Sequence, residues 1–577
     1  MSSTSPRAGG PPPDPEVVLL WTAIAVSCGA VVVLFTAAHL AVLIRGGRQR
    51  IPGNPVLFAI DVANGTVKLP ALTAAIAVGL AVSLAAAVAG VLLRFRRWQR
   101  RHVDRAARWM GGGREITRLS VRHAERTARR LGVEQPGLPV ARTVGTGELL
   151  YMGWEDVAVD VWGPRTGKTT SRAIPSILAA PGPVLATSNK RDLADATRDV
   201  RAERGRVWVF DPQGIAGERP DWWWNPLGYV TDEVKAIELA DVFALASREV
   251  SARTDAFFDT AGQNLVSQLL LAAALDQREL TQVHLWLSAE TDQEPVEILK
   301  EHGYRVIATA LQAQINAPER QRGGVFGTAR EMCAFMTNRQ AMRWVTCPHA
   351  QRPQFDAREF AVSTDTLYSL SKEGKAGAAP LVTALTLAVC EAAEETAKTC
   401  RGGRLAMPLV AVLDEAANVC RWRKLPDLYS HYGSRGILLL TILQSWSQGV
   451  EVWGREGMRK LWSAATVKVY GGGVSEVEFL EELSRLIGDH DQLTRSDSHS
   501  YKQGRSSSRS VRQARILDVA DLAAMPQGRA VVIASGSRPT LAVPIPWMAG
   551  PDSDRVRKSL QAHDPINDSS HEAAPRW

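Results

Sequence analysis

Residues 161–172, VWGPRTGKTTSR, constrain the fold of this chain more than any other segment. Asp156 to Val161 alternates weakly and predicts a short strand before them, and Thr170 to Ala179 predicts a helix after them. A Gly-Lys-Thr sequence between a strand and a helix is typical of a phosphate-binding loop. Gly167 permits a tight turn, and the N–H groups of residues 166–170 can point at phosphate oxygens from the start of the helix.

This loop predicts a site for ATP and Mg²⁺. Lys168 is placed to reach the β- and γ-phosphates, and the Thr169 hydroxyl is placed to bind Mg²⁺. The usual pattern begins with a glycine where this chain has Trp162, and a glycine follows at the next position. A helix-start turn that binds no ligand is the alternative. The predicted nucleotide-binding residues are Gly163, Pro164, Arg165, Thr166, Gly167, Lys168, Thr169 and Thr170.

A second segment supplies carboxylates that suit the same chemistry. Residues 408–415, PLVAVLDE, are apolar before the last two, which predicts a buried strand ending in Asp414 and Glu415. In phosphate-loop ATPases an acidic residue at this strand end holds Mg²⁺, and a following glutamate can polarise the attacking water. We therefore predict that Asp414 and Thr169 bind the metal and that Glu415 is the general base. An apolar run followed by an acid is common, so this prediction depends on the pairing with Lys168.

A third apolar stretch, Gly436 to Ile442, predicts another strand, and Gln444 follows it closely. A glutamine at this strand end lies next to the γ-phosphate in RecA-like ATPases, where it can sense hydrolysis. An ordinary polar strand terminus is the alternative. Arg435, just before the strand, is a candidate to act across a subunit boundary on the charge that develops on phosphate. A plain surface arginine is the alternative at that position.

Short apolar strands alternate with helical stretches through the rest of the chain. Residues 184–187 and 207–210 predict strands, and residues 190–204 between them predict a helix. This order favours a parallel sheet with nucleotide at its carboxyl edge. Residues 231–345 show helical periodicity and little strand character, so we expect an all-helical insertion there. Further strands are predicted at residues 466–470 and 530–534.

Two long apolar stretches lie near the N-terminus. Residues 17–44 and 70–93 contain no Asp, Glu, Lys or Arg, and each is long enough to cross a bilayer as a helix. A buried hydrophobic hairpin is the alternative. Seven arginines follow the second stretch and four cations lie in the connecting loop, so we place both termini in the cytoplasm and the protein in the cell membrane. The seven are Arg94, Arg96, Arg97, Arg100, Arg101, Arg105 and Arg108.

Composition adds less. The formal charge of +8 fits a polyanion or a membrane surface, and solvated arginines give the same sum. The six cysteines show no zinc or disulfide spacing, which suits a reducing cytoplasm. Residues 494–515 are Ser-rich and basic, which is more typical of a solvated loop than of a contact with phosphate backbone. Residues 222–224, three tryptophans, are expected to pack before Asn225 and Pro226 rather than to stack on bases.

The order of these segments resembles the type IV coupling proteins of the TraG/TraD class, the conjugative DNA-transfer ATPases. The resemblance spans roughly residues 140–547. The phosphate loop and the acidic strand occur in many ATPases, so it is the other segments that distinguish this class from other phosphate-loop proteins. The matching segments are GPRTGKTT, IPSILAAPGPVLATSNKRDLADAT, RGRVWVFDPQG, WWWNPL, PLVAVLDEAANV, LPDLYSHYGSRGILLLTILQSWSQ and DLAAMPQGRAVVIASGSRP.

This resemblance implies a RecA-like α/β nucleotide domain with an inserted all-α domain, preceded by two transmembrane helices. It implies a homohexameric ring with ATP between subunits, which receives a relaxase-bound DNA strand and passes it to a type IV secretion channel. It assigns the phosphate loop to residues 163–170, the carboxylates to Asp414 and Glu415, and the sensor to Gln444, and it leaves the arginine finger unplaced. The expected parts are a tail (1–16), an anchor (17–93), a basic juxtamembrane helical segment (94–139), the ATPase domain (140–547, insertion 231–345) and a disordered tail (548–577).

Three other functions fit the same motifs. An FtsK-like translocase moves duplex DNA, but such proteins usually carry a winged-helix module where this chain has a short polar tail. A docking receptor would bind cargo with little ATP turnover, against which the intact Lys168, Asp414 and Glu415 argue. A transporter of protein alone is the third. No relaxase motif is present in the chain, so we expect another protein to nick the DNA.

Overall fold

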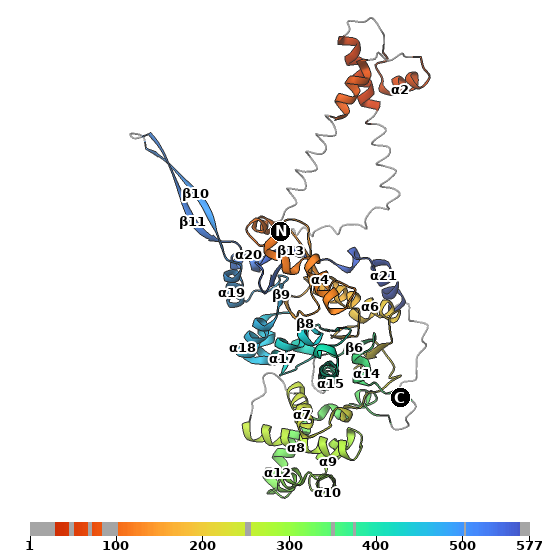
Figure 1. Ribbon diagram of the computed structural model, residues 1–577, viewed down its shortest axis with the longest axis vertical. Helices are drawn as coiled ribbons and strands as arrows, with labels where there is room; N and C mark the ends of the chain where they lie inside the picture. Colours follow the sequence, from red (N-terminus) through yellow and green to blue (C-terminus); the bar gives the residue numbers. More distant parts are fainter. Residues whose placement is uncertain are drawn as a thin grey trace, which may run out of the picture. The chain divides into compact units, whose positions relative to one another are not determined.

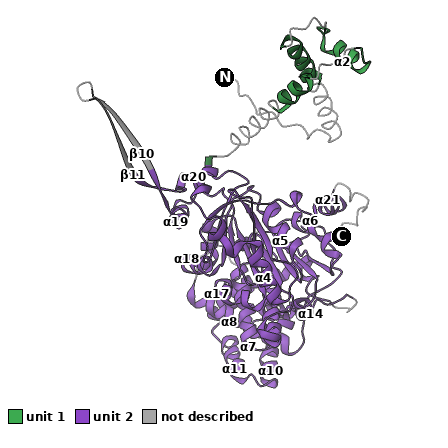
Figure 2. Cartoon of the chain, turned by 45° about the horizontal axis from the view of Figure 1, so that its top comes forward, with its two compact units in different colours: residues 1–102 green, residues 103–577 purple. Residues whose placement is uncertain are grey.

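The structure is a computed structural model that separates into two units, residues 1–102 and residues 103–577 (Figures 1 and 2). Each unit is described by itself. The described residues are 29, 31–44, 51–66, 72–82, 102–247, 255–347, 352–372, 377–500 and 504–565, of which 493–500 and 504–510 are described by backbone alone.

The first unit is helical where it is described. Residues 31–44 and 72–82 are helices, and α2 (Pro55–Ala63) lies between them in the chain. The Asn54 side chain caps α2 by accepting a hydrogen bond from the Val56 N–H at 2.9 Å. Within the described residues, no helix is both long enough and apolar enough to span a membrane. The other residues of the two predicted spans lie outside the described part of the chain.

An eleven-stranded sheet forms the centre of the second unit, in the order β2-β1-β13-β12-β9-β3-β8-β7-β4-β6-β5. The seven strands from β9 to β5 are parallel, and the other four extend the sheet antiparallel beyond β9. The predicted parallel sheet is therefore confirmed. The strands are β1 (Leu138–Thr143), β2 (Leu149–Met152), β3 (Ala158–Val161), β4 (Val184–Ser188), β5 (Val207–Phe210), β6 (Thr366–Leu370), β7 (Leu409–Leu413), β8 (Ile437–Leu443), β9 (Val467–Tyr470), β12 (Ala530–Ala534) and β13 (Thr540–Val543).

Both faces of the parallel sheet are covered, which explains why most residues of its strands are apolar, as in β7. Successive residues of β3 enter different hydrophobic clusters: Ala158 packs into the core on one face and Val159 into the core on the other. All seven residues of β8 are buried. Helices that pack beside the strands include α5 (Ile174–Ala179), α6 (Asp192–Ala202), α15 (Ala379–Thr399), α16 (Ala416–Val419), α17 (Leu425–Tyr432), α18 (Trp446–Ala464), α19 (Val477–Ile487) and α20 (Val519–Ala523).

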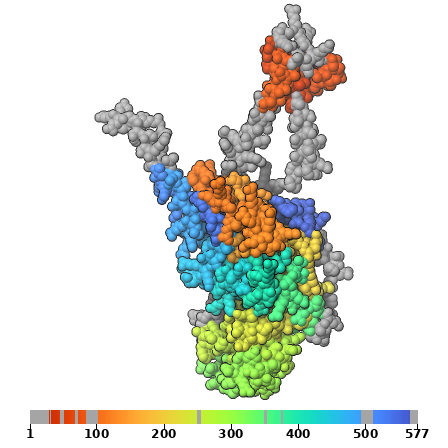
Figure 3. Space-filling model, viewed as in Figure 1, coloured from red at the N-terminus to blue at the C-terminus, as the bar shows by residue number. Residues whose placement is uncertain are grey.

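A helical insertion separates β5 from β6. Figures 1 and 3 show it as a yellow-green block at one end of the second unit. It occupies the stretch for which the sequence predicts an all-α insertion, residues 231–345, and its described residues contain no strand. Its helices are α7 (Glu233–Ser247), α8 (Ala256–Leu275), α9 (Thr281–Ser288), α10 (Glu294–Glu301), α11 (Arg305–Ile315), α12 (Glu319–Met332) and α13 (Arg339–Met342), and α14 (Ala357–Ala361) follows them.

The base of this insertion is built on an aromatic cluster. Trp222 is buried and contacts Trp208 edge-on at 5.2 Å and Trp344 edge-on at 5.6 Å between ring centroids. The outgoing and returning chains also pair there, because Phe355 N–H donates to the Trp223 carbonyl at 2.8 Å. Trp224 is buried as well. The structure thus agrees with packing, and not with base stacking, for the tryptophan run.

Two segments differ from expectation. The tail after Gly550 was expected to be disordered, yet Ser553–Ala562 forms helix α21, which packs on α6 through buried Val556 and a hydrogen bond from Ser559 Oγ to the Asp195 carbonyl at 2.6 Å. The Ser-rich segment 494–515, for which a loop is the more typical structure, belongs instead to a hairpin of β10 (Asp489–Ser500) and β11 (Gly504–Arg515). Of the predicted basic helical segment, residues 94–139, the described part forms η1 (His102–Arg108), η2 (Gly113–Leu119) and α4 (Val121–Leu131), and β1 already begins at Leu138.

Candidate nucleotide site

The phosphate-binding loop leaves the carboxyl end of β3, which lies between β8 and β9. Arg165 (φ +60°) and Gly167 (φ +95°) both have left-handed backbone conformations. For Arg165 this conformation is uncommon and costs energy, which is typical of binding loops. The helix that follows opens with a π turn, η3 (Thr169–Ala173), before α5 begins. The strand, loop and helix therefore stand in the predicted order.

Trp162, which replaces the usual first glycine, is buried with 1% of its surface exposed. Its N–H donates to the Leu443 carbonyl at 2.9 Å, so it extends the pairing between β3 and β8. Its indole lies against Gly471, where a Cβ atom would fall 2.1 Å from the ring. The bulk of the tryptophan is thus accommodated by a glycine in another loop.

The phosphate loop is held directly by residues 471–473, which follow β9. Gly163 N–H donates to the Gly472 carbonyl at 2.8 Å. A Cβ atom on Gly163 would lie 2.0 Å from the Gly473 oxygen, so only glycine fits there. Further along, Gln527 Nε2 donates to the Arg165 carbonyl at 3.3 Å. The C-terminal part of the chain therefore supports the loop from one side.

Lys168 meets both predicted carboxylates. Its Nζ lies 2.8 Å from Glu415 Oε1 and 3.0 Å from Asp414 Oδ1, and all three side chains are almost fully buried. Thr169 Oγ1 lies 3.5 Å from Asp414 Oδ2. In the sheet, β8 lies between β3 and β7, and the three strands are parallel. Their carboxyl ends therefore lie at the same edge of the sheet, which brings these groups together.

Glu415 lies at the centre of this group. Its backbone is left-handed (φ +53°), which is uncommon for glutamate and typical of a constrained functional position. Gln444 Nε2 donates to Glu415 Oε1 at 2.6 Å, and Asn189 Nδ2 donates to Glu415 Oε2. The carboxylate is therefore oriented by three partners from three different segments, counting Lys168.

Two residues of the site were not predicted. Asn189 follows β4, which pairs with β7, so its place after a strand of the parallel sheet was the available signal. Glu476 accepts hydrogen bonds from the N–H groups of Trp446 and Ser447 at 2.8 and 2.9 Å, and so fixes the start of α18 just after Gln444. Nothing in the sequence near Glu476 marks this role.

Arg435 is not part of this group. It precedes β8, whereas Gln444 follows β8, so the two residues lie at opposite edges of the sheet. Arg435 Nε pairs with Glu394 Oε1 at 3.4 Å. Its action on a neighbouring subunit stays a prediction.

The residues present fit Mg²⁺. Burial raises the pKa of Asp414, although Lys168 opposes this shift, so a nearby divalent cation would favour the ionised form. Within the described residues, Asp414 Oδ1 forms an ion pair with Lys168 Nζ at 3.0 Å but no well-aligned hydrogen bond. Within the same part of the chain there is no cluster of three His, Cys, Asp or Glu side chains suited to a metal. One hydroxyl and one carboxylate are what Mg²⁺ needs when water and phosphate complete its shell.

Asp414→Asn is expected to raise the melting temperature of the nucleotide-free protein at neutral pH. The pKa of Asp414 is higher in the folded protein than in the unfolded chain, where it is about 4. Asp414 therefore contributes most to the stability of the folded protein below about pH 4, and this contribution is lost as the pH rises through the folded-state pKa. The gain from the variant should therefore shrink as pH falls toward 4. Thermal unfolding between pH 4 and 8 measures this. Glu456→Gln, at a side chain 91% exposed, is the control and should show no such trend.

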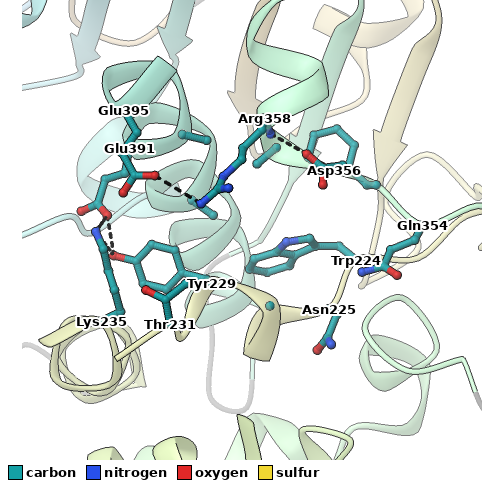
Figure 4. A pocket seen from close by; sticks show the side chains of 15 residues that line it. Trp224, Asn225, Tyr229, Thr231, Lys235, Gln354, Asp356, Arg358, Glu391 and Glu395 are labelled. Carbon is teal, nitrogen blue, oxygen red and sulfur yellow. Dashed lines mark hydrogen bonds and ion pairs between the residues drawn. The ribbon is translucent and has the colours of Figure 1, made fainter. Parts of the chain in front are cut away.

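A second cavity, of about 340 Å³, lies at the base of the insertion (Figure 4). There the Tyr229 hydroxyl lies 2.6 Å from Glu391 and 2.8 Å from Glu238, and Lys235 forms ion pairs with both carboxylates. Burial raises the pKa of Glu391, and the hydrogen bond from Lys235 opposes this. Lys424 pairs with Glu238 at 2.6 Å. This network ties α7 of the insertion to α15 and to the loop before α17.

Comparison with known proteins agrees with this description. The fold is mixed α/β with a central parallel sheet, and the site brings the lysine of the phosphate-loop motif together with two carboxylates. Residues 408–527, which begin at β7 and include Asp414, Glu415 and Gln444, match the family described as the TraM recognition site of TraD and TraG. Comparison with curated proteins found no match.

Among solved structures, the bacterial conjugative coupling protein TrwBdeltaN70 has a similar fold. Its unbound monoclinic form has a TM-score of 0.51 at 14% identity, covering 76% of this chain and 96% of that one. Its trigonal form in complex with sulphate has a TM-score of 0.52 at 15% identity, with the same coverage. The family match and the shared fold together confirm the resemblance to type IV coupling proteins.

Proposed function

We propose that this chain is a membrane-anchored ATPase that couples relaxase-bound DNA to a type IV secretion channel and drives conjugative transfer. One observation carries the proposal. Lys168 and the pair Asp414–Glu415, almost 250 residues apart in the chain, meet at one edge of the sheet, and the two carboxylates lie in the segment, residues 408–527, that matches the coupling-protein family. Gln444 completes the group.

Each residue of the site has a role in this proposal. Thr169 and Asp414 would hold Mg²⁺, which would supply positive charge next to the phosphates. Lys168 contacts two carboxylates in the structure, so it must weaken at least one of these contacts to reach phosphate. Loss of its contact would leave Glu415 free to accept a proton from water. Gln444 touches Glu415 and can report this change to α18, which starts two residues later.

The remaining parts follow from the family. We propose that residues 17–44 and 70–93 anchor the protein in the cell membrane, with the second unit in the cytoplasm. A homohexameric ring with ATP between subunits would give Arg435 of one subunit access to the next. The description of the matched family names TraM, so a protein of the relaxosome is the expected partner of residues 408–527. DNA, preferably single-stranded, is the proposed cargo.

ATP hydrolysis by residues 103–577, which form one compact unit, is expected to rise when single-stranded DNA is added. Lys168→Ala should abolish both the basal and the stimulated rates, because it removes the only cation of the described residues that contacts Asp414. Phosphate release with single-stranded DNA, duplex DNA and no DNA measures this. Stimulation by duplex alone would favour an FtsK-like translocase. Hydrolysis indifferent to DNA would count against a DNA motor and favour a docking receptor.

A further inference from the structure

The hairpin of β10 and β11 is a sheet of its own, separate from the central one. Figures 1 and 2 show it projecting from the body of the second unit. Twelve residue pairs form its ladder, from Asp489 with Arg515 to Ser500 with Gly504. Neither the nucleotide site nor the helical insertion requires such an arm.

The register of the ladder sorts its residues by chemistry. Paired residues share a face, and successive pairs alternate between faces. In the outer part, one face holds the pairs Arg495 with Arg509 and His499 with Arg505, with Asp497 and Ser507 between them. The opposite face holds only serine, threonine and glycine: Thr494 with Ser510, Ser496 with Ser508, Ser498 with Ser506 and Ser500 with Gly504. We call these the arginine face and the hydroxyl face.

The arginine face is costly without a partner. Arg495 lies directly opposite Arg509, and like charges in opposite positions destabilise a sheet. A two-stranded ribbon is also only marginally stable by itself. A bound polyanion would reduce the repulsion between the arginines by neutralising their charge. It would also stabilise the two-stranded ribbon by holding its strands in place.

The root of the arm is well ordered and connects to the phosphate loop. Leu517, just after β11, is buried, and its carbonyl accepts a hydrogen bond from Ser484 Oγ of α19 at 2.6 Å. At the other strand, the His490 ring contacts the Trp109 ring in a tilted arrangement, with 3.8 Å between ring centroids. Met525, beyond α20, lies against Gly472, whose carbonyl holds Gly163. The arm is therefore fixed to the part of the chain that supports the nucleotide site.

The chemistry favours nucleic acid among polyanionic partners. Residues 494–510 contain no Ala, Val, Leu, Ile, Met, Phe or Trp, so the outer arm lacks the apolar face that a membrane-bound hairpin or a protein interface needs. Arginine binds phosphate bidentately. The Arg495–Arg509 and His499–Arg505 pairs are four residues apart, about 13 Å along the ribbon, and a two-stranded ribbon fits a major groove about 12 Å wide.

We propose that the arginine face of the β10–β11 hairpin binds the phosphate backbone of DNA through Arg495, Arg505 and Arg509. This rests on the proposed function, since DNA is its cargo, and assigns part of DNA binding to one named surface. This contact depends on the charge of the DNA and is independent of its sequence, because the phosphate groups are the same for every base.

The test uses the full-length protein and fluorescence anisotropy with labelled single-stranded and duplex oligonucleotides over a range of salt. The test variant carries three substitutions, Arg495→Ala, Arg505→Ala and Arg509→Ala. Its plot of log affinity against log salt should be less steep than that of the wild-type protein, by about 2 for single strands and about 3 for duplex, because three phosphate contacts are lost. The matched control on the hydroxyl face, Ser496→Ala, Ser508→Ala, Ser510→Ala, should keep the wild-type slope. The corresponding triple lysine variant should keep it too, which separates loss of charge from loss of folding.

Each outcome decides between the two proposals. If the wild-type protein binds DNA and the alanine variant has the same affinity and slope, the arm proposal is overturned and the proposed function stands. If the wild-type protein binds no DNA, both fall. If the alanine variant instead loses binding to vesicles containing anionic lipid while its DNA binding is intact, the arm binds membrane and the proposal is wrong.

Discussion

Glu415→Gln is expected to lower steady-state ATP hydrolysis by about 10²- to 10⁴-fold, the usual contribution of a general base, while ATP still binds. Glutamine keeps the size of the side chain and can still accept the hydrogen bond from Gln444 through its one oxygen, but it loses the one from Asn189, which Glu415 accepts on its other oxygen, and it cannot take a proton from water. Lys168 keeps its contact with Asp414 at 3.0 Å and remains available to phosphate. Phosphate release and binding of a fluorescent ATP analogue separate the two effects.

The control for this variant is Glu395→Gln. Glu395 lies on α15 and pairs with Arg358 at 3.6 Å, away from the nucleotide site. Its hydrolysis should match that of the wild-type protein. Turnover within a few-fold of wild type for Glu415→Gln would remove Glu415 from the general-base role and leave it as an orienting partner of Lys168.

Trp162→Gly is expected to destabilise the protein by about 3–5 kcal/mol, the usual cost of truncating a buried tryptophan, although it restores the glycine of the common motif. Trp162 is buried among core residues and fills the space opposite Gly471. Removal would leave a cavity under the phosphate loop and should weaken ATP binding as well. The midpoints of urea unfolding and the ATP dissociation constant measure the two losses.

Trp162→Phe is the matched control, because it keeps an aromatic ring against Gly471. Its loss of stability should be clearly smaller than that of the glycine variant. Equal stability of Trp162→Gly and the wild-type protein would mean that the loop does not depend on this packing, and would contradict the role assigned to the tryptophan.

The parallel strands could be predicted from the sequence where burial on both faces leaves runs that are apolar throughout, as in β7, or broken by one polar residue, as in β8. Strand β6 was missed for the converse reason. Its Thr366 and Ser369 are fully buried, and Arg201 Nε satisfies Thr366 Oγ1 at 2.7 Å. The sequence alone cannot tell a polar residue that is exposed to water from one that is buried and hydrogen-bonded to a residue 165 positions away, as Thr366 is to Arg201.

The same contrast holds at the site. Lys168, Asp414 and Glu415 could be predicted because each occupies the end of a recognisable strand or loop. Asn189 also follows a predicted strand, and that signal was not used, whereas nothing in the sequence marks the hydrogen bonds of Glu476 to Trp446 and Ser447. The β10–β11 hairpin was missed because its sequence shows no hydrophobic alternation to reveal a strand. Helix α21 was missed because it buries little besides Val556 and Ser559.

The contact of residues 162 and 163 with the glycines at 471–473 has a consequence for how such a chain can diverge or be engineered. The two loops interlock so closely that a side chain gained on one must be matched by a side chain lost on the other. A chimera can take the phosphate loop from one coupling protein and the last hundred or so residues from another. Its two contacting loops then come from different proteins, and their side chains do not match in size. Recombination between them is tolerated only where both partners of the contact come from the same parent.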